Sequence, residues 1–417
     1  MSQVMNSHFY PSSFSVLYRG SVKDLRGPTD LASKDGNVPG VVFDYSDAYS
    51  VFDWGRMPDL LAKKGHSLAL IAADWFEKIE RPETWKEFSR TPDATALRKG
   101  NRFGASFNEL GEELQKSGLR THYIGMLQEA SSEREMSPGA LRPLPLSDLQ
   151  KPARHLAVKQ VSVVKPAMQT VLGRAVPDYL PTRNAPAPRL IPLEVIFRFS
   201  CPQGSSLSER VARDPGYMAS IGFGDFKVAE GEKWDFPVLE LFTKLETTDR
   251  PLTLTEALAI SGLSGAQMQR LLLKTAWVAG WLKSLCARSG VELADGKLEW
   301  ALLESGDVML VDAVGPDELR LLKNGVQLSK EFLRNFYRGS SWYQAVNRAK
   351  ELGRSHGVAE WKKLAAEQPP VLTPRHKELA TNLYQALANQ LTGRQWFPQA
   401  MTLDQVVKGI QEISTST

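Results

Sequence analysis

Cysteine and long apolar runs are scarce in this chain of 417 residues. Two cysteines, Cys201 and Cys286, are too few for a disulfide framework, and they argue against a zinc cluster. The most apolar stretch, Leu271 to Leu285, is interrupted by Lys274 and Lys283, and it falls short of the ~18 uninterrupted apolar residues that a membrane span needs. These absences exclude a disulfide-stapled or membrane-spanning protein, and they predict a soluble protein of the reducing cytoplasm.

Charge of one sign is also lacking, since the formal net charge is only +4. So small an excess gives no reason to expect nucleic acid as a partner. Residues 1–14 show neither the charged start nor the apolar core of a secretion signal. We therefore expect small-molecule partners, with no nucleic acid and no membrane, and a homo-oligomer is left open.

What the chain does contain is the composition of an ordinary globular protein, with 42% hydrophobic and 24% charged residues. At about 150 residues per domain, its length predicts two to three domains or one large bilobal unit. Strand patterns prevail in the first two thirds and helical patterns at the end, which favours an α+β fold. The predicted strands are two extended pieces within 16–24, then 41–45, 155–164 and 193–199; the predicted helices are 60–78, 266–288, 374–392 and a short one capped by Thr402 and Gln405.

Six prolines fall within the stretch Pro166 to Pro192. Proline at this density excludes a continuous helix or a central strand, so the stretch is predicted to be a long connection or hinge. Positive charge is concentrated close by, with eight basic and two acidic residues in 151–200. This excess is typical either of a solvated basic face or of a site for a phosphorylated ligand, and both interpretations stay open.

A predicted hairpin brings two carboxylates together. Ser305 and Gly306 between two apolar runs suggest a two-residue loop, which places Glu299 directly opposite Asp312. Opposed carboxylates repel unless a cation such as Mg²⁺ binds both or both side chains face water, and the pattern leaves the two alternatives open. A register slip of one residue would send them to opposite faces. Strand alternation also places Asp295, Lys297 and Glu299 on one face.

Six short motifs occur in an order that resembles the SAICAR synthetase (phosphoribosylaminoimidazole-succinocarboxamide synthase) family. They are Leu-Tyr-Arg-Gly-x-x-Lys at 17–23, Asp-x-x-Ser-x-x-Asp at 47–53, Ile-Pro-Leu-Glu-Val-Ile-x-Arg at 191–198, Gly-Ser at 204–205, Ala-Asp-x-Lys-Leu-Glu at 294–299, and Val-Asp-x-x-x-Pro-Asp-x-x-Arg at 311–320. The resemblance extends from about residue 16 to about residue 352. No single motif is decisive, but the ordered set is specific.

The resemblance implies a bilobal, ATP-grasp-like or kinase-like α+β fold with antiparallel sheets and a nucleotide cleft. It implies a ligase of purine biosynthesis that joins L-aspartate to the carboxylate of carboxyaminoimidazole ribonucleotide, with ATP and Mg²⁺. The expected domains are an amino-terminal nucleotide-binding lobe at 1–165, a proline-rich hinge at 166–192, a larger lobe with the metal and substrate site at 193–352, and a helical extension at 353–417.

The resemblance also implies roles for single residues of this chain. It assigns the ATP phosphates to Gly20 and Lys23, the adenine to Lys159 and Glu194, the metal to Glu299 and Asp312, a catalytic part to Lys297, Asp47 and Ser50, and the ribonucleotide or the amino acid to Arg198, Gly204, Ser205, Lys244, Asp249 and Arg320. The nucleotide and metal positions match the family pattern better than the substrate positions do.

Several positions depart from the family pattern. Ser21 replaces a usual lysine, Thr248 replaces the histidine before Asp249, and Ala313 and Leu319 replace a glutamate and a serine. The hinge is longer, and the 65 residues after 352 show no counterpart in the family pattern. Three hypotheses therefore remain: SAICAR synthetase itself, a diverged amide ligase that uses another acid and amine, and a non-catalytic nucleotide-binding relative.

Overall fold

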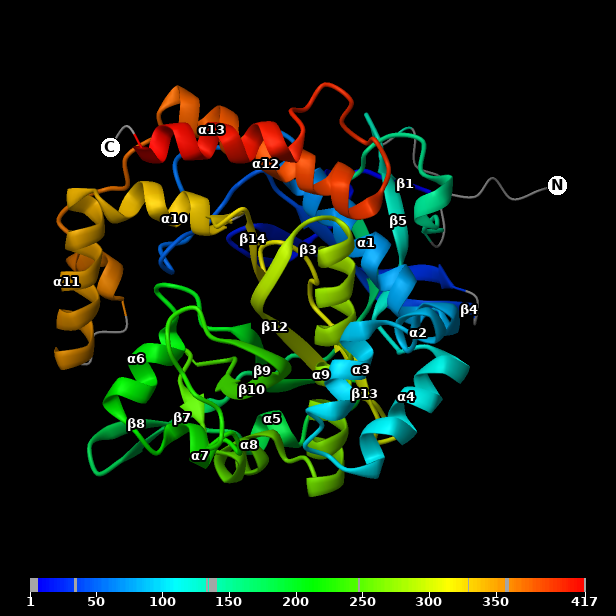
Figure 1. Cartoon of the computed structure of the whole chain (residues 1–417). Helices are drawn as coiled ribbons and strands as arrows, with labels where there is room; N and C mark the ends of the chain where they lie inside the picture. Colours follow the sequence, from blue (N-terminus) through cyan, green and yellow to red (C-terminus); the bar gives the residue numbers. More distant parts are fainter. Residues whose placement is uncertain are drawn as a thin grey trace. The chain divides into compact units, whose positions relative to one another are not determined.

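The computed structural model describes residues 7–33, 36–132, 134, 141–246, 248–328, 330–356 and 360–415. Helices and largely antiparallel sheets both occur, which confirms the α+β class (Figure 1). Two compact units form: unit 1 comprises Met1–Asp74, Tyr123–Lys159 and Gly315–Thr417, and unit 2 comprises Trp75–His122 and Gln160–Val314. The predicted contiguous domains 1–165, 166–192, 193–352 and 353–417 stay a prediction.

The sheet of unit 1 is built around the predicted strands. Its order is β1 (His8–Phe9), β5 (Tyr123–Glu129), β6 (His155–Lys159), β4 (Gly36–Tyr45), β3 (Lys23–Ser33) and β2 (Val16–Arg19). The two extended pieces predicted around Gly20 are β2 and the start of β3, and they pair antiparallel. The predicted strand 155–164 ends earlier, at Lys159.

In unit 2 the central strands are β10 (Lys233–Thr243), β9 (Arg189–Ser200) and β12 (Glu292–Leu302), all antiparallel. At the outer edge of β10 lies β11 (Pro251–Leu252), and β13 (Val308–Val311) pairs with β12. One face is an apolar row in which Leu241, Val195 and Leu298 lie side by side and are buried. The helix α9 (Gly265–Arg288) packs against β9, β10 and β12, and Figure 1 shows it beside them.

Most of the predicted helices are confirmed. The predicted helix 266–288 is α9, and α12 (Pro374–Thr392) begins at the Thr373 cap and ends at Gly393 in a left-handed conformation. The Thr402–Gln405 capping box opens α13 (Leu403–Thr415) with both reciprocal bonds made. The predicted helix 60–78 is α1, which spans Lys64–Glu80 and so begins four residues later than predicted. The remaining helices are α2 (Pro82–Phe88), α3 (Pro92–Lys99), α4 (Ala105–Ser117), α5 (Leu180–Arg183), α6 (Ser206–Arg213), α7 (Tyr217–Ser220), α8 (Leu254–Ser261), α10 (Lys330–Arg338) and α11 (Ser341–His356). Within the described ranges, no helix is both long and apolar enough to cross a membrane.

The proline-rich stretch is not purely a connection. It holds a two-stranded hairpin of β7 (Ala167–Val171) and β8 (Arg174–Asp178), followed by α5. Its end belongs to the central strand β9, so the expectation that proline excludes a central strand is wrong at Pro192. The strand tolerates this proline because the ladder between β9 and β12 is irregular there, with Glu299 opposite Glu194 but Ala301 opposite Leu190.

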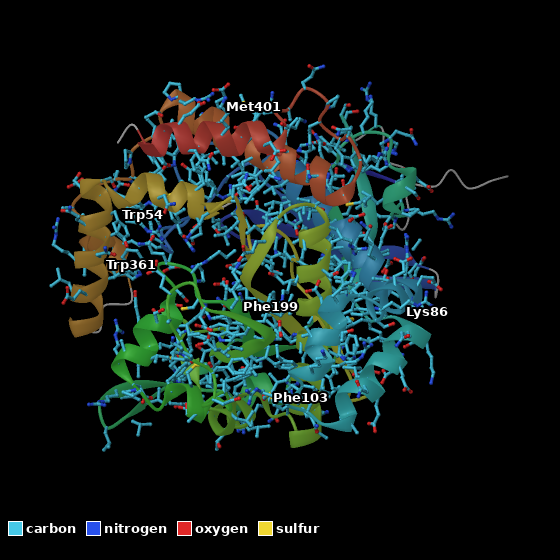
Figure 2. The ribbon with its side chains drawn as sticks, in the orientation of Figure 1. Trp54, Lys86, Phe103, Phe199, Trp361 and Met401 are labelled. Atoms are coloured by element: carbon cyan, nitrogen blue, oxygen red, sulfur yellow. The ribbon has the colours of Figure 1, made fainter. Side chains whose placement is uncertain are left out.

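The carboxyl-terminal residues belong to unit 1. They include the last helices and the short strands β14 (Leu319–Lys323) and β15 (Val326–Gln327). Within this unit Trp361 lies beside Trp54, with ring centroids 6.2 Å apart (Figure 2). A segment that the sequence could not assign is therefore packed against the amino-terminal part of the same unit.

Candidate functional site

One face of the unit 2 sheet carries charged side chains. Glu194 on β9 is directly opposite Glu299 on β12, and Arg198 is opposite Asp295. Lys297 and Glu240 both pair with Ile196 from the two sides. Because opposed residues share a face and the side-chain period of a strand is two, all of these residues point the same way. The register thus confirms that Asp295, Lys297 and Glu299 share one face.

Two lysines hold the facing glutamates. The Nζ atom of Lys244, just beyond the end of β10, lies 2.8 Å from Glu194 Oε1 and 2.7 Å from Glu299 Oε1. Lys297 Nζ donates a hydrogen bond to Glu194 Oε1 at 2.6 Å. Both carboxylates are buried, whereas the Lys297 and Lys244 side chains are 35% and 27% exposed. The lysine side chains are therefore the part of this cluster that is exposed to solvent.

The two glutamates of this cluster have different protonation behaviour. Burial raises the pKa of Glu299 to about 7, and the nearby charge of Asp312 adds to the effect. Burial acts on Glu194 in the same direction, but Lys297 and Lys244 outweigh it and lower the pKa of that carboxyl. The carboxylates likewise outweigh burial at both lysines and raise the pKa of each ammonium. Near neutral pH the site therefore holds two ammonium ions and an ionised Glu194, while Glu299 takes up a proton more readily than an ordinary glutamate.

The predicted register of the β12–β13 hairpin is wrong by one residue. Glu299 is opposite Val311 rather than Asp312, because the loop contains three residues and Leu303 N–H donates to the Asp307 carbonyl at 2.9 Å. The third loop residue, Gly306, has φ +79°, which is typical of a three-residue hairpin loop with a bulge. The sequence argument took this loop for a two-residue turn.

Asp312 nevertheless acts on Glu299. The strand β13 ends at Val311, and Asp312 takes a left-handed conformation with φ +65°, so strand alternation no longer decides where its side chain points. The backbone carbonyl of Asp312 accepts a hydrogen bond from His122 Nε2 at 3.0 Å. The carboxylates that are paired across strands are Glu194 and Glu299, with Asp312 as a third nearby charge.

The donor chemistry of Glu299 and Asp312 fits a hard cation. Magnesium is commonly held by one or two carboxylates together with substrate phosphates, so it does not require a cage of protein ligands. The described part of the chain contains no group of three or more His, Cys, Asp or Glu residues able to hold a metal ion. Within the same part, Glu299 Oε1 is buried without a hydrogen bond, and its cationic neighbour is the Lys244 ammonium. The two carboxylates therefore fit a magnesium ion shared with a ligand.

Arg198 lies in a second ionic cluster on the same face. Its guanidinium donates to Glu240 at 2.5 Å and to Asp295 at 3.2 Å. Glu240, only 1% exposed, also accepts from Arg210 at 2.6 Å and from the Tyr217 hydroxyl at 2.7 Å. The sequence analysis missed Glu240, Arg210 and Tyr217. A signal was present for Glu240, since a lone charge in the apolar run 236–242 must be paired when it is buried.

Three other predicted substrate residues belong to unit 2. Gly204 has φ +72° and precedes Ser205, whose hydroxyl caps α6 by accepting from Leu207 N–H at 3.3 Å. The next residue, Ser206, accepts from Arg198 at 3.3 Å, so this turn adjoins the arginine. Asp249 is exposed in the loop that follows Lys244. The structure thus brings Gly204 and Ser205 to Arg198.

The residues predicted for the ATP phosphates lie in unit 1. Gly20 separates β2 from β3, and its N–H donates to the Lys23 carbonyl at 3.0 Å. A Cβ atom at Gly20 would come within 2.3 Å of that carbonyl oxygen, so the turn requires glycine. Lys23 Nζ lies 4.7 Å from the centre of the Phe43 ring. Lys159, the last residue of β6, pairs with Gly40.

Three further predicted residues also belong to unit 1. The carboxylate of Asp47 accepts from the backbone N–H of Lys63 at 3.1 Å and of Gly65 at 3.0 Å, so it caps the start of α1. Ser50 is half-buried in the loop between Asp47 and α1. Arg320, on β14, is half-buried, and its charge helps Arg334 to overcome burial and lower the pKa of Glu331.

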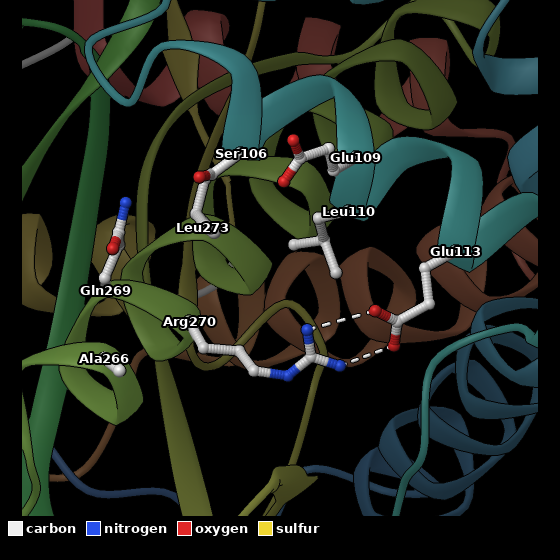
Figure 3. Close-up of a pocket in the computed structure, with 8 residues that line it drawn as sticks. All are labelled: Ser106, Glu109, Leu110, Glu113, Ala266, Gln269, Arg270 and Leu273. Carbon is white, nitrogen blue, oxygen red and sulfur yellow. Dashed lines mark hydrogen bonds and ion pairs between the residues drawn. The ribbon is translucent and has the colours of Figure 1, made fainter.

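A surface pocket lies elsewhere on unit 2, between α4 and α9 (Figure 3). The guanidinium of Arg270 crosses it to Glu113, at 2.5 Å, and also bonds Asp307. Arg270 and Glu113 of this pocket are thus paired with each other, and none of the predicted site residues lines it.

Comparison with known proteins shows the family of this chain. The SAICAR synthetase family profile matches residues 183–349. The chain is 32% identical over 395 residues to the phosphoribosylaminoimidazole-succinocarboxamide synthase of Thermoplasma acidophilum, covering 91% of this chain and 99% of the relative. It is 33% identical to an Archaeoglobus fulgidus protein that carries the same enzyme name provisionally, covering 94% and 99%. The chain belongs to the SAICAR synthetase family.

Membership makes the chain a ligase of purine biosynthesis that forms carbon–nitrogen bonds. The fold agrees with that of the SAICAR synthase from Saccharomyces cerevisiae solved in complex with SAICAR, at a TM-score of 0.52 and 18% identity, covering 92% of this chain and 96% of that one. The match to the Archaeoglobus fulgidus relative leaves about 25 residues of this chain uncovered, fewer than the 65 after residue 352. The expectation that these 65 residues have no counterpart in the family is therefore wrong for at least part of them.

Proposed function

We propose that the protein is a cytoplasmic ATP- and Mg²⁺-dependent ligase that joins L-aspartate to the carboxylate of carboxyaminoimidazole ribonucleotide. The observation that carries the proposal is the charged sheet face, on which Glu194, Glu299, Lys244 and Lys297 meet. Family membership supplies the reaction class, and this cluster supplies the groups that phosphoryl transfer to a carboxylate requires.

Glu299 and Asp312 are proposed to hold the Mg²⁺. When bound, the ion would neutralise phosphate oxygens of the nucleotide and of the transferring phosphoryl group. Lys297, bonded to Glu194 and partly exposed, stays protonated because Glu194 raises its pKa despite burial. It can therefore donate to an oxygen on which negative charge develops.

Lys244 has a related role. In the free protein its ammonium balances Glu194 and Glu299, which would otherwise repel across the strand pair. A cation that binds Glu299 would leave this ammonium free to turn toward an anionic ligand.

No covalent protein nucleophile is required, because the substrate carboxylate attacks the phosphoryl group and the amine then captures the acyl phosphate.

The other assignments follow from the family resemblance. Gly20 and Lys23 are proposed for the ATP phosphates, and Lys159 and Glu194 for the adenine. Asp47 and Ser50 are proposed to take part in catalysis. On the substrate side, Arg198, Gly204, Ser205, Arg320 and Asp249 are proposed for the ribonucleotide and the amino acid. The contact of Ser206 with Arg198 supports a shared role for the 204–205 turn and that arginine.

Two residue changes favour an amine substrate other than aspartate. Leu319 is buried where the family has a serine, and Thr248 stands where the family has a histidine. Both changes remove polar partners from the substrate side, and a dianionic amino acid would lose about 1–3 kcal/mol for each missing hydrogen bond. The second candidate is thus the same ligation with an amine other than aspartate.

One assay tests both candidates. Release of ADP and phosphate is measured with carboxyaminoimidazole ribonucleotide and a panel of amino acids, and the amide product is identified by mass. Turnover that requires the ribonucleotide and aspartate supports the proposal. Growth of a purine auxotroph that lacks this step, once it expresses this protein, would support it as well. Preference for another amine supports the second candidate. Absence of turnover with every amino acid contradicts both.

A further inference from the structure

A short loop of unit 1 has an uncommon backbone. Phe52 and Asp53 follow one another with φ +53° and +60°, in the left-handed region that residues with a side chain seldom occupy. Two such residues in succession persist only where surrounding contacts hold them. The loop, residues 47–55, carries Asp47 and Ser50 of the proposed site.

Aromatic rings from the carboxyl-terminal segment hold this loop. The Phe52 ring lies 4.5 Å from that of Tyr343, and the Trp54 ring meets Trp342 edge-on at 5.5 Å. Trp342 is 1% exposed and also contacts Phe52 at 6.2 Å. Trp361 also lies beside Trp54, with ring centroids 6.2 Å apart (Figure 2). Phe52 of the left-handed pair and Trp54, which follows the pair, are thus in contact with the rings of Trp342, Tyr343 and Trp361.

Polar contacts join the same two segments. Lys350 on α11 donates to Asp53 Oδ2 at 2.7 Å, and its ammonium lies 5.0 Å from the Trp361 ring. The hydroxyls of Tyr49 and Tyr337 are 2.6 Å apart and buried. The two segments are nearly 300 residues apart in sequence, so only the tertiary structure brings them together.

The far end of the loop is anchored independently. The Asp47 carboxylate caps α1, and the first residue of that helix, Lys64, forms a buried ion pair with Asp317 at 2.8 Å. The Tyr384 hydroxyl on α12 donates to the other oxygen of Asp317 at 2.7 Å. With one end bound to α1, the conformation at 52–54 depends on the aromatic contacts.

From these contacts we infer that residues 337–350 together with Trp361 position the 47–55 loop, and that Trp342 is a positioning residue which acts through Phe52 and Trp54 on Ser50. The inference rests on the proposed function for its catalytic consequence. Without Trp342 the left-handed pair loses a buried neighbour and relaxes, and the loop side chains move. Misplacement of a site group by about 1 Å can cost as much as a hundredfold in rate.

The experiment compares Trp342→Leu with Trp342→Phe and with Trp396→Leu. Trp396 is a matched control, because it is also a buried tryptophan of the carboxyl-terminal region, but it packs on Arg394, which bonds the carbonyls of 146 and 149. Hydrogen exchange is followed at the amides of Trp54 and Met57, which donate to the loop carbonyls of Val51 and Tyr49, respectively. The kcat and KM for ATP are measured on the same samples.

We expect Trp342→Leu to speed exchange at both amides and to lower kcat by about tenfold to a hundredfold, with KM for ATP changed by no more than about threefold. Trp342→Phe should keep amide exchange and kcat close to the wild-type values, since a ring remains against Trp54. Trp396→Leu should leave amide exchange and kcat unchanged, even where it lowers thermal stability as much as Trp342→Leu does. If Trp342→Leu fails to fold, Lys350→Met takes its place with the same expected directions, because Lys350 is half-buried and bonds Asp53 directly.

Two results overturn the inference. One is unchanged exchange at Trp54 and Met57 in the folded variants. The other is faster exchange with an unchanged kcat, which would show that the loop does not serve the reaction. A wild-type protein that does not ligate at all contradicts the proposed function alone, and the exchange data then still decide whether the segment positions the loop.

Discussion

Glu194 on β9 is the direct cross-strand partner of Glu299 on β12. The two carboxylates of this pair share one ammonium, because Lys244 Nζ is within 2.8 Å of both Oε1 atoms. Their environments differ, since burial raises the pKa of Glu299 to about 7 while two lysines lower that of Glu194. A pair that would repel if both members were ionised is thereby retained in a buried position.

The first prediction contrasts these two glutamates. Glu299→Gln should abolish ATP turnover, since it removes a proposed metal ligand, while the free energy of unfolding without Mg²⁺ at pH 8 holds or rises. The reason is that ionised Glu299 is disfavoured by burial and by Asp312. Glu194→Gln should instead destabilise by about 1–3 kcal/mol, because the ionised form of Glu194 is the one favoured by its lysines.

Urea unfolding and an ADP-release assay check this pair of variants, and Asp312→Asn should share the loss of turnover. Full activity of Glu299→Gln or Asp312→Asn at ordinary Mg²⁺ concentrations would eliminate the metal assignment. Equal destabilisation by Glu299→Gln and Glu194→Gln would contradict the difference between the two carboxyls.

The second prediction separates two arginines proposed to contact the acidic substrate. Lysine retains the charge but lacks the planar fork, so Arg198→Lys and Arg320→Lys should each raise the KM for that substrate more than the KM for ATP. Only Arg198→Lys should also lower the unfolding free energy, by about 1–3 kcal/mol, because Arg198 satisfies the buried Glu240. A rise confined to the KM for ATP would show that the roles are misassigned.

The third prediction concerns acid stability. Burial opposes ionisation of Asp44, but His155 and then Arg26 outweigh it and lower its pKa to about 2, from 3.8 in an unfolded chain. A lowered carboxyl pKa stabilises the fold above pH ~4, and this contribution is lost as the pH falls toward 2. Asp44→Asn should therefore cost about 2 kcal/mol at pH 6 and little at pH 2. Urea unfolding curves at the two pH values provide the check, and a cost that does not change with pH would refute the prediction.

The fourth prediction tests the observed hairpin loop. Gly306 has φ +79°, so Gly306→Ala should destabilise by about 1–2 kcal/mol through backbone strain. Gly339 is the control, since it has no left-handed φ and a Cβ there meets no atom within 4 Å. Gly339→Ala should be neutral or slightly stabilising. Thermal unfolding measures both, and equal effects would contradict the three-residue loop.

Local patterns predicted much of the secondary structure and some of the site. The sequence predicted helices α9 and α12 and the Thr402–Gln405 capping box, because caps and apolar periodicity depend on residues that are close together along the chain. Strand alternation also predicted the shared face of Lys297 and Glu299. The sequence did not predict the helices between 82 and 117. It also assigned the wrong partner to Glu299, because one extra loop residue shifts the strand register.

By itself, the sequence determined the α+β class, the family and most of the residue types at the charged face. These features depend on the order of residues along the chain. The tertiary structure alone decided that Glu194 faces Glu299, that Lys244 joins them, and that Glu240 pairs with Arg198. It alone brought Trp342 to Trp54. Such pairings depend on strand register and on packing between segments distant in sequence, and no local pattern encodes either of them.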